Sequence, residues 1–142
     1  MDNIKRIYKK SSSPYSFAKN YFKYLNDVLN SINENDINAL AEFLDKCRIR
    51  RGTTFVIGNG GSATTATTMS NDLGFDILKK TSTKKPFRIH SLTDSNAVIS
   101  AIGNDIGYEN IFYSQLQTQF KKGDCLIVIS ASGNSSNLVK AA

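Results

Sequence analysis

The stretch Phe55-Val56-Ile57-Gly58-Asn59-Gly60-Gly61-Ser62-Ala63-Thr64-Thr65-Ala66 decides the fold of this chain. Its apolar start predicts a short buried strand. The glycines that follow predict a tight turn into a helix, because glycine tolerates positive φ and close approach of the backbone. Ser62 is predicted to cap that helix, whose free N–H groups would form an anion site. Phosphate is the natural ligand. A turn that needs glycine only for its geometry is the alternative.

Two better-known phosphate motifs fit this stretch less well. No lysine follows the glycines, which excludes a Walker A loop. Gly58-Asn59-Gly60 begins like the dinucleotide fingerprint, and Ala63 stands at its third glycine position, which the pattern tolerates. That fingerprint also requires an acidic residue about 20 positions later, after a second strand. Residues 77–81 predict no such strand, so only the first part of the fingerprint is present. Dinucleotide binding remains an open alternative.

A second loop of the same kind lies near the end of the sequence. The apolar run Cys125–Ile129 predicts a strand that is buried on both faces of a parallel sheet. Ser130-Ala131-Ser132-Gly133-Asn134-Ser135-Ser136-Asn137 follows it and leads into a helix. Ligands of open α/β sheets bind at the carboxyl ends of strands, and hydroxyls with backbone N–H groups hold phosphate without a cation. A serine-rich cap without a ligand is the alternative.

The remaining chain predicts alternating helices and strands. Residues 1–13 are expected to form a loose arm, and Ser13-Pro14 has the pattern of a helix start. Helices are predicted over about residues 14–32, 37–47, 62–73, 96–102 and 107–122, with strands over 55–57, 87–92 and 125–129. Gly74 is predicted to end the third of these helices. This order indicates an α/β fold with a parallel, doubly wound sheet. Three strands would leave an apolar edge, so we expect the first part of a longer domain.

Composition limits the possible functions. Hydrophobic residues make up 40% of the 142 residues, which is typical of a globular protein. No apolar run reaches the length of about 18 residues that a membrane helix needs, and residues 1–6 do not resemble a signal peptide, so a cytoplasmic protein is expected. The net charge of +6 favours anionic ligands, but its basic clusters carry no nucleic-acid-binding signature. Cys47 and Cys125 are predicted to be buried thiols.

Several separated motifs, in this order, resemble the sugar isomerase (SIS) domain and, within it, the phosphoheptose (sedoheptulose 7-phosphate) isomerases. These are Gly58–Ser62, Ser91-Leu92-Thr93, Ala101–Glu109, Lys122-Gly123-Asp124 and Ile129–Ser135. The resemblance begins near Tyr15. It implies a three-layer α/β/α sandwich with a parallel, flavodoxin-like sheet, incomplete at its C-terminus. Residues 1–50 would form an N-terminal arm with two helices, and residues 51–142 the first portion of the phosphosugar-binding domain.

The resemblance also implies where the substrate binds. A homo-oligomer, a tetramer or a dimer, is expected, with sites between subunits and no membrane partner. A sugar phosphate is the implied ligand. The residues implied to contact it are Asn59, Gly60, Gly61, Ser62, Asn104, Asp105, Ser130, Ser132 and Ser135.

The catalytic residues of the family match this sequence less closely. Aldose–ketose isomerisation moves a proton between adjacent carbons and needs a general base. The phosphoheptose isomerases place a histidine and a glutamate four residues apart on the helix after the glycine loop, a pair suited to zinc. Thr68 and Asp72 occupy these positions here. Thr68 argues against zinc, so no metal and no cofactor is expected. Asp72 is the candidate base, and a solvated carboxylate near a helix end is its alternative.

Two functions from different classes remain after this comparison. The first is an isomerase that converts sedoheptulose 7-phosphate into glycero-manno-heptose 7-phosphate. The second is a non-catalytic SIS domain, either a phosphosugar sensor or a protein-binding adaptor of the type that associates with a replication initiator. Thr68 favours the second function. The later glutamine and histidine of the family would lie beyond Ala142, and His90, within a predicted strand, is expected to be a packed residue rather than a ligand.

Overall fold

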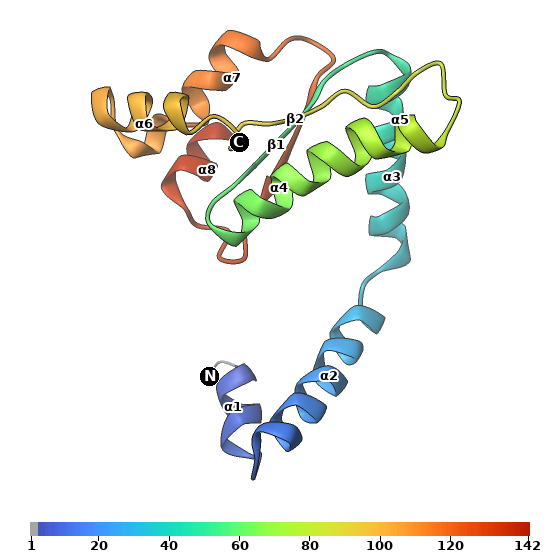
Figure 1. Ribbon diagram of the computed structural model, residues 1–142, viewed down its shortest axis with the longest axis vertical. Helices are drawn as coiled ribbons and strands as arrows, with labels where there is room; N and C mark the ends of the chain where they lie inside the picture. Colours follow the sequence, from blue (N-terminus) through green and yellow to red (C-terminus); the bar gives the residue numbers. More distant parts are fainter. Residues whose placement is uncertain (1–2) are drawn as a thin grey trace. The chain divides into compact units, whose positions relative to one another are not determined.

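The computed structural model describes residues 3–142, which divide into two compact units, one up to residue 41 and one over residues 42–142. The first unit contains α1 (Asn3–Lys9), α2 (Pro14–Asn30) and the beginning of α3 (Glu34–Ile49) (Figure 1). The second unit contains the remainder of α3 and the whole sheet.

The start of α2 confirms the helix start predicted at Ser13-Pro14. The Ser16 N–H donates to Ser13 Oγ at 3.1 Å, and the Ser13 N–H donates to Ser16 Oγ at 3.0 Å, so a reciprocal capping box forms. The prediction of a loose arm over residues 1–13 was wrong for its described part, because α1 forms there. The ring of Tyr8 packs edge-on against Phe17 with centroids 5.9 Å apart, and this contact holds α1 against α2.

A parallel sheet of three strands forms the centre of the second unit, as the sequence predicted. β1 (Thr54–Gly58) lies between β2 (Ile89–Ser91) and β3 (Cys125–Ile129), in the order β2-β1-β3. β1 and β3 are paired from Thr54 with Cys125 to Gly58 with Ile129. The two strands therefore end level with one another, and the loops that follow them begin at the same edge of the sheet.

Helices cover both faces of this sheet. α4 (Gly61–Asn71) lies on one side, and α6 (Asn96–Asp105), α7 (Tyr113–Gln119) and α8 (Ser136–Ala141) gather on the other (Figure 1). A hydrophobic cluster joins the second group of helices to the sheet. Its buried members are Phe55, Ile57, Leu92, Ile111, Phe112, Leu116 and Leu138. Ala66 of α4 is buried as well.

The helix after the glycine loop is longer than predicted. Gly74 does not end it. The backbone continues from α4 through a π-helical turn, η1 (Asp72–Asp76), into α5 (Ile77–Lys80). A single glycine inside a helix costs only about 1 kcal/mol, so other contacts can offset it. The Asp76 carboxylate pairs with Lys79 at 2.9 Å and with Lys80 at 3.5 Å, which supports the last turn.

Other predicted boundaries shift in the structure. The second strand is shorter than residues 87–92, and the helix predicted over 107–122 is divided into η2 (Tyr108–Asn110), a short 3-10 helix, and α7. β3 forms where predicted, but Val128 is 37% exposed because β3 is an outer strand of the three. Burial on both faces was therefore wrong for β3.

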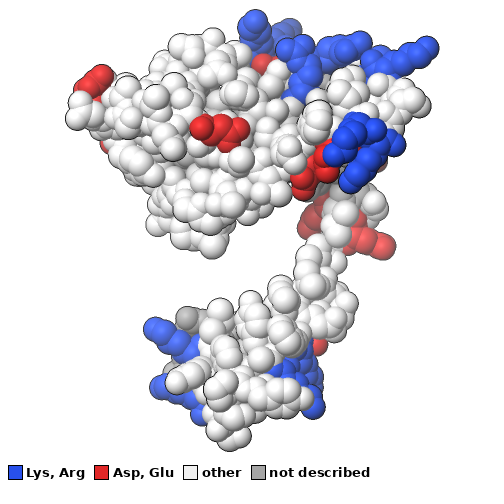
Figure 2. Space-filling model, in the orientation of Figure 1, with Lys and Arg blue, Asp and Glu red and all other residues white. Residues whose placement is uncertain are grey.

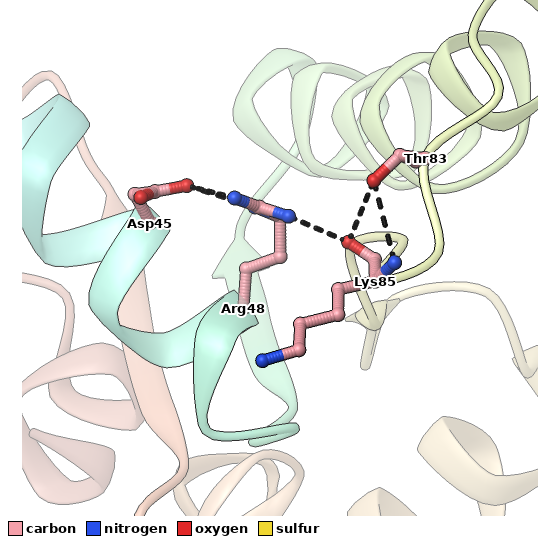
Figure 3. A network of polar contacts seen from close by, with 4 residues as sticks. All are labelled: Asp45, Arg48, Thr83 and Lys85. Carbon is pink, nitrogen blue, oxygen red and sulfur yellow. Dashed lines mark hydrogen bonds and ion pairs between the residues drawn. The ribbon is translucent and has the colours of Figure 1, made fainter.

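Arg48, near the end of α3, fixes the loop that precedes β2 (Figure 3). Its guanidinium donates to Asp45 Oδ1 at 2.6 and 2.8 Å and to the Lys85 carbonyl at 2.8 Å. Thr83 closes the network around the same carbonyl. The guanidinium also lies over the ring of Phe87, 5.5 Å from its centroid.

The two cysteines are buried free thiols, as predicted. Cys47 is 0% exposed and Cys125 is 2% exposed. His90 lies in β2, where its ring meets Phe55 edge-on at 5.9 Å, while much of the side chain stays exposed. Within residues 3–142, no helix combines the length and the apolar character needed to cross a bilayer.

Candidate functional site

Two loops meet at the carboxyl edge of the sheet. The glycine loop, residues 58–62, leaves β1, and the serine loop, residues 130–137, leaves β3. Because β1 and β3 are paired in parallel up to Gly58 and Ile129, their loops begin side by side. The structure therefore brings together two of the three groups of residues that the resemblance implied for substrate contact.

Two glycines give the glycine loop its shape. A side chain at Gly58 would place its Cβ 2.7 Å from the backbone of Ser62, so only glycine lets the strand end so close to α4. Gly60 has φ +55° and is the N-cap of α4. Helix α4 thus begins at Gly61, one residue before the predicted start, and the prediction that Ser62 caps it was wrong. A Cβ at Gly60 or at Gly61 would have no neighbouring atom within 4 Å, so the space beside both glycines is open.

The N–H groups at this turn are available to a ligand. Ser62 and Ala63 donate their N–H groups to the carbonyls of Asn59 and Gly60, both at 3.0 Å. Within the described residues, the N–H groups of Gly60 and Gly61 donate to no other group. Unpaired N–H groups at the start of an eleven-residue helix attract an anion.

A reciprocal amide pair joins the two loops. Asn59 Nδ2 donates to Asn137 Oδ1 at 2.9 Å, and Asn137 Nδ2 donates to Asn59 Oδ1 at 2.9 Å. Asn137 is 1% exposed, so both of these bonds are protected from water. Tyr108 of η2 adds a longer bond from its hydroxyl to Asn59 Oδ1 at 3.5 Å. Asn59 therefore fixes the spacing of the loops.

Asn137 and Tyr108 were not singled out from the sequence. The only available signal for Asn137 was its place at the end of the serine-rich stretch.

The serine loop presents hydroxyl groups around a glycine in the left-handed region. Gly133 has φ +66°, and its N–H donates to Ser130 Oγ at 3.0 Å. Ser132 Oγ accepts a weaker bond of 3.4 Å from the Asn134 N–H and stays exposed. Ser135 is the N-cap of α8, and its side chain makes no cap bond. The hydroxyls of Ser132 and Ser135 are thus free to donate to a phosphate.

Both loops lack charged side chains. Neither residues 58–62 nor residues 130–137 contain Lys, Arg, Asp or Glu. Figure 2 agrees on the face it shows, where the lower end of residues 42–142 carries no basic side chain and the opposite end carries several. An anion at the loops would therefore be held by backbone N–H groups and hydroxyls alone.

A chain of hydroxyl groups connects α4 to the end of β2. Thr67 Oγ1 donates to Asp94 Oδ1 at 2.6 Å and lies 3.2 Å from Thr93 Oγ1. Thr93 Oγ1 in turn lies 2.6 Å from Ser91 Oγ. Asp94 follows a strand at the same sheet edge as the two loops, and its carboxylate was not predicted as a site residue. The strand-end position was the available signal.

Asn104 and Asp105 lie at the end of α6. Asn104 Nδ2 donates to Asp105 Oδ1 at 2.8 Å, and both residues are exposed. Within the described residues, no hydrogen bond joins either side chain to the glycine or serine loop. Their predicted contact with substrate stays a prediction.

Asp72 lies at the opposite end of α4 from the glycine loop. With a rise of 1.5 Å per residue, eleven residues separate Asp72 from Gly61 by roughly 16 Å along the helix. Asp72 is the first residue of the π-helical turn η1, and its exposed carboxylate accepts a bond of 3.1 Å from Asn71 Nδ2. Short π-helical turns within α-helices occur frequently at functional sites. Asp72 cannot reach the two loops of its own chain, and its role as a base stays a prediction.

Thr68 stands at a position where the resemblance implies a zinc ligand. Zinc sites in proteins use histidine, cysteine and carboxylate ligands, and Thr68 supplies none of these. Among residues 3–142, no group of three such side chains could hold a metal ion.

Comparison with known proteins agrees with this geometry. A family model described as "SIS domain" matches residues 20–142. The phosphoheptose isomerase of Sulfurimonas denitrificans is 40% identical over 116 residues, which is 77% of this chain and 56% of that protein. Phosphoheptose isomerase 2 of Campylobacter jejuni is 41% identical over 88 residues, or 62% of this chain and 42% of that protein. The chain thus spans about half the length of these curated relatives.

Solved structures show the same likeness. A phosphoheptose isomerase from Francisella tularensis superposes with a TM-score of 0.77 at 26% identity, over 99% of this chain and 68% of that chain. The enzyme from Neisseria gonorrhoeae gives a TM-score of 0.72 at 28% identity, over 84% of this chain and 60% of that chain. The parallel sheet, the two loops at its carboxyl edge and the family match over residues 20–142 lead to one conclusion. The chain belongs to the SIS domain family.

Proposed function

We propose that the protein is an aldose–ketose isomerase that converts sedoheptulose 7-phosphate into glycero-manno-heptose 7-phosphate. The observation that carries this proposal is the Asn59–Asn137 amide pair, which holds two loops with free hydrogen-bond donors next to one another. Relatives named phosphoheptose isomerase, at 40% and 41% identity, support the choice of substrate.

In the proposed complex the serine loop holds the phosphate of the sugar. Ser132 and Ser135 donate their hydroxyls, and the N–H groups of Gly60 and Gly61 donate to sugar oxygens or to the phosphate. These donors are neutral, and the Asn59–Asn137 pair joins the loops that carry them before the ligand arrives, so less free energy is spent on ordering the loops. Hydrogen bonds from neutral donors to a charged phosphate each contribute about 1.5–3 kcal/mol.

The chemistry requires a base that removes a proton from the carbon next to the carbonyl. The same base then returns the proton to the neighbouring carbon of the enediol. Asp72 is the proposed base. Because it lies roughly 16 Å along α4 from the glycine loop of its own chain, we place it at the loops of a second copy, so that the active site forms between subunits.

The exposed apolar side of α2 supports this homo-oligomer. Phe22 is 65% exposed, Leu29 is 56% exposed, and Leu25 and Val28 are each 40% exposed. These residues share one side of the helix, while Lys23 and Asp27 lie on the other. A second copy of the chain that covers this side would remove a large apolar surface from water.

A non-catalytic SIS protein is the second candidate, and Thr68 is the observation that favours it. A phosphosugar sensor needs the loops but no base and no histidine at this position, and a protein-binding adaptor needs none of these. The isomerase and the sensor bind through the same residues, so binding alone does not separate these two.

The test is calorimetric titration of the chain with sedoheptulose 7-phosphate, followed by an assay for aldoheptose product in the same sample. The isomerase proposal requires both binding and turnover. Asp72→Asn should abolish turnover and leave the dissociation constant within about twofold, because the amide keeps the size of the carboxylate but accepts no proton at neutral pH.

Asp27→Asn is the matched control, because Asp27 is also an exposed carboxylate near the end of a helix. It should leave both binding and turnover unchanged. Retained turnover in Asp72→Asn would exclude Asp72 as the base. Binding without turnover in the parent chain would favour the sensor, and a folded chain that ignores the sugar phosphate would favour the adaptor.

A further inference from the structure

A cavity lies at the amino edge of the sheet, away from the glycine and serine loops. It has a volume of about 840 Å³ and is formed by the ends of α3 and α7, the start of β1 and β2, and the loop before β3. This volume falls within the range of small-molecule sites, about 300–1,000 Å³. We call it the basic pocket because five cationic residues line it: Arg50, Arg51, Arg88, Lys121 and Lys122.

The charges of the basic pocket are not balanced from within. Asp124 is the only acidic residue that lines it. Both of its carboxylate oxygens are occupied by backbone, since Oδ1 accepts from the Thr53 N–H at 2.7 Å and Oδ2 from the Lys121 N–H at 2.8 Å. Among residues 3–142, the cations that take part in ion pairs are Lys46, Arg48, Lys79 and Lys80, and none of them lines the pocket. Asp124 is thus the single counter-charge to five cations in the lining, and the excess of positive charge favours an anionic ligand.

Hydrogen bonds and close packing of the backbone hold the walls of the pocket in place. Arg50 Nε donates to the Gly123 carbonyl at 2.7 Å, and Arg50 Nη2 lies 3.4 Å from Cys125 Sγ. Asp124 joins the loops on either side of the pocket through the two backbone bonds already described. Gly52 packs so closely that a Cβ there would lie 2.3 Å from the Gly123 carbonyl oxygen.

Further contacts hold Arg51 and the loop before β2 in place. Arg51 adopts φ +65°, the only non-glycine residue with positive φ among those described, and its Nη2 donates to the Lys84 carbonyl at 3.4 Å. The Arg48 network in Figure 3 holds the neighbouring Lys85 carbonyl, three residues before Arg88. The side chains of Arg88, Lys121 and Lys122 make no hydrogen bond or ion pair with another described residue, so they remain free to bind.

We propose that the basic pocket binds a small anion with two or more phosphate groups, at a site separate from the sugar phosphate. Guanidinium groups match phosphate oxygens with paired hydrogen bonds, and ammonium groups add charge. One monophosphate would leave most of the five cations unpaired, whereas a polyphosphate engages several of them. The volume of about 840 Å³ suits a small molecule, whereas a nucleic-acid strand needs a groove that follows several nucleotides.

The test is calorimetric titration of the whole chain with pyrophosphate and with tripolyphosphate. Arg88→Gln and Lys121→Gln should each weaken binding about tenfold, the effect of losing one charge-assisted hydrogen bond. Lys84→Gln is the matched control. It removes one positive charge from the same loop as Arg88 but not from the wall of the pocket, and it should change binding less than twofold.

Several results would overturn the proposal. These are the absence of saturable binding of both anions, an equal loss in Lys84→Gln, or a loss in Ser132→Ala, which would place the anion at the serine loop. A single-stranded oligonucleotide that binds more tightly than tripolyphosphate would assign the pocket to nucleic acid instead.

One arm of the experiment needs no variant. Saturating sedoheptulose 7-phosphate should leave pyrophosphate binding to the parent chain unchanged, and displacement would contradict separate sites. Adenosine triphosphate should bind like tripolyphosphate if phosphates alone are recognised, and more tightly if the pocket also contacts a base.

Discussion

Ser132 gives the most direct test of phosphate binding at the scale of single residues. Its hydroxyl is exposed and accepts only one weak bond of 3.4 Å from the Asn134 N–H. Ser132→Ala should therefore weaken sedoheptulose 7-phosphate binding about tenfold while the unfolding midpoint barely changes, because a donor to the phosphate is lost and no buried contact is lost. Calorimetry and thermal unfolding measure the two quantities. Ser12→Ala, in an exposed loop, is the control, and equal affinity in the two variants would contradict the proposed role.

Cys125 predicts how stability depends on pH. Burial and the neighbouring Cys47 thiol raise the pKa of Cys125 from 9.0 to about 11. Below pH 9 the thiol is neutral in both the folded and the unfolded chain. As pH rises from about 9 to 11, the unfolded chain releases this proton first, so the free energy of unfolding should fall by about 2 kcal/mol. Urea unfolding at pH 8 and pH 10.5 measures this loss, which Cys125→Ala should reduce. The same loss in both chains would refute the assignment.

Single residues also show where sequence analysis stops. Gly60, Ser132 and Ser135 were predicted from their position after buried strands, and the structure places both groups at one sheet edge. The pairing of Asn59 with Asn137 was not predicted, because it depends on the register of β1 with β3 and not on any local pattern. The strand-end position of Asp94 was a usable signal, but its bond to Thr67 could not be predicted, because it joins two elements that are distant in sequence.

At the scale of elements, the junction of β1 with α4 offers a matched pair of glycines. Gly58→Ala should destabilise the protein by about 1–3 kcal/mol, because its Cβ would lie 2.7 Å from the Ser62 backbone and the strand and helix would have to separate. Gly61→Ala has no neighbour within 4 Å and lies in the first turn of a helix, so it should leave stability unchanged or raise it slightly. Urea unfolding compares the two, and equal midpoints would show that the close approach at Gly58 is not required.

Elements were predicted well where the signal is local. The Ser13-Pro14 pattern and the apolar run at Cys125–Ile129 each identified an element at its observed position. The prediction that Gly74 ends its helix was wrong. Glycine has a low helix propensity, but the π-helical turn and the Asp76 ion pairs that follow it offset this cost. Phe120, within the helix predicted over residues 107–122, lies beyond the end of α7 at Gln119 and is 43% exposed.

At the scale of the whole molecule, oligomerisation can be tested through α2. Phe22→Asp should lower the mass measured by analytical ultracentrifugation, because a charge in an apolar interface is left without a partner. Phe22 is already 65% exposed within the chain, so its replacement should not unfold the monomer. Asn30→Asp adds the same charge at the exposed end of α2 and should leave the mass unchanged. Turnover should fall with the mass if Asp72 acts at the loops of a second copy.

The parallel sheet and the family could be predicted from the sequence, since separated motifs agreed in order. The exposure of Val128 could not be predicted, because it depends on which strand lies at the edge of the sheet. The basic pocket could not be predicted either, because it depends on which loops meet in the folded chain. Charge counts indicated anionic ligands in general. Only the fold separates the neutral loops at one edge of the sheet from the cationic pocket at the other.

The amide pair that joins the loops also bears on how long the site lasts chemically. Asn59 precedes Gly60, and asparagine followed by glycine is prone to spontaneous loss of its side-chain amide, a lesion of ageing proteins, because the next backbone nitrogen can attack the side-chain carbonyl. Two hydrogen bonds of 2.9 Å to the buried Asn137 hold the Asn59 side chain and oppose the rotation that this attack requires. The folded chain should therefore keep Asn59 intact longer than the unfolded chain. An aspartate formed there would place a negative charge where the phosphate is proposed to bind.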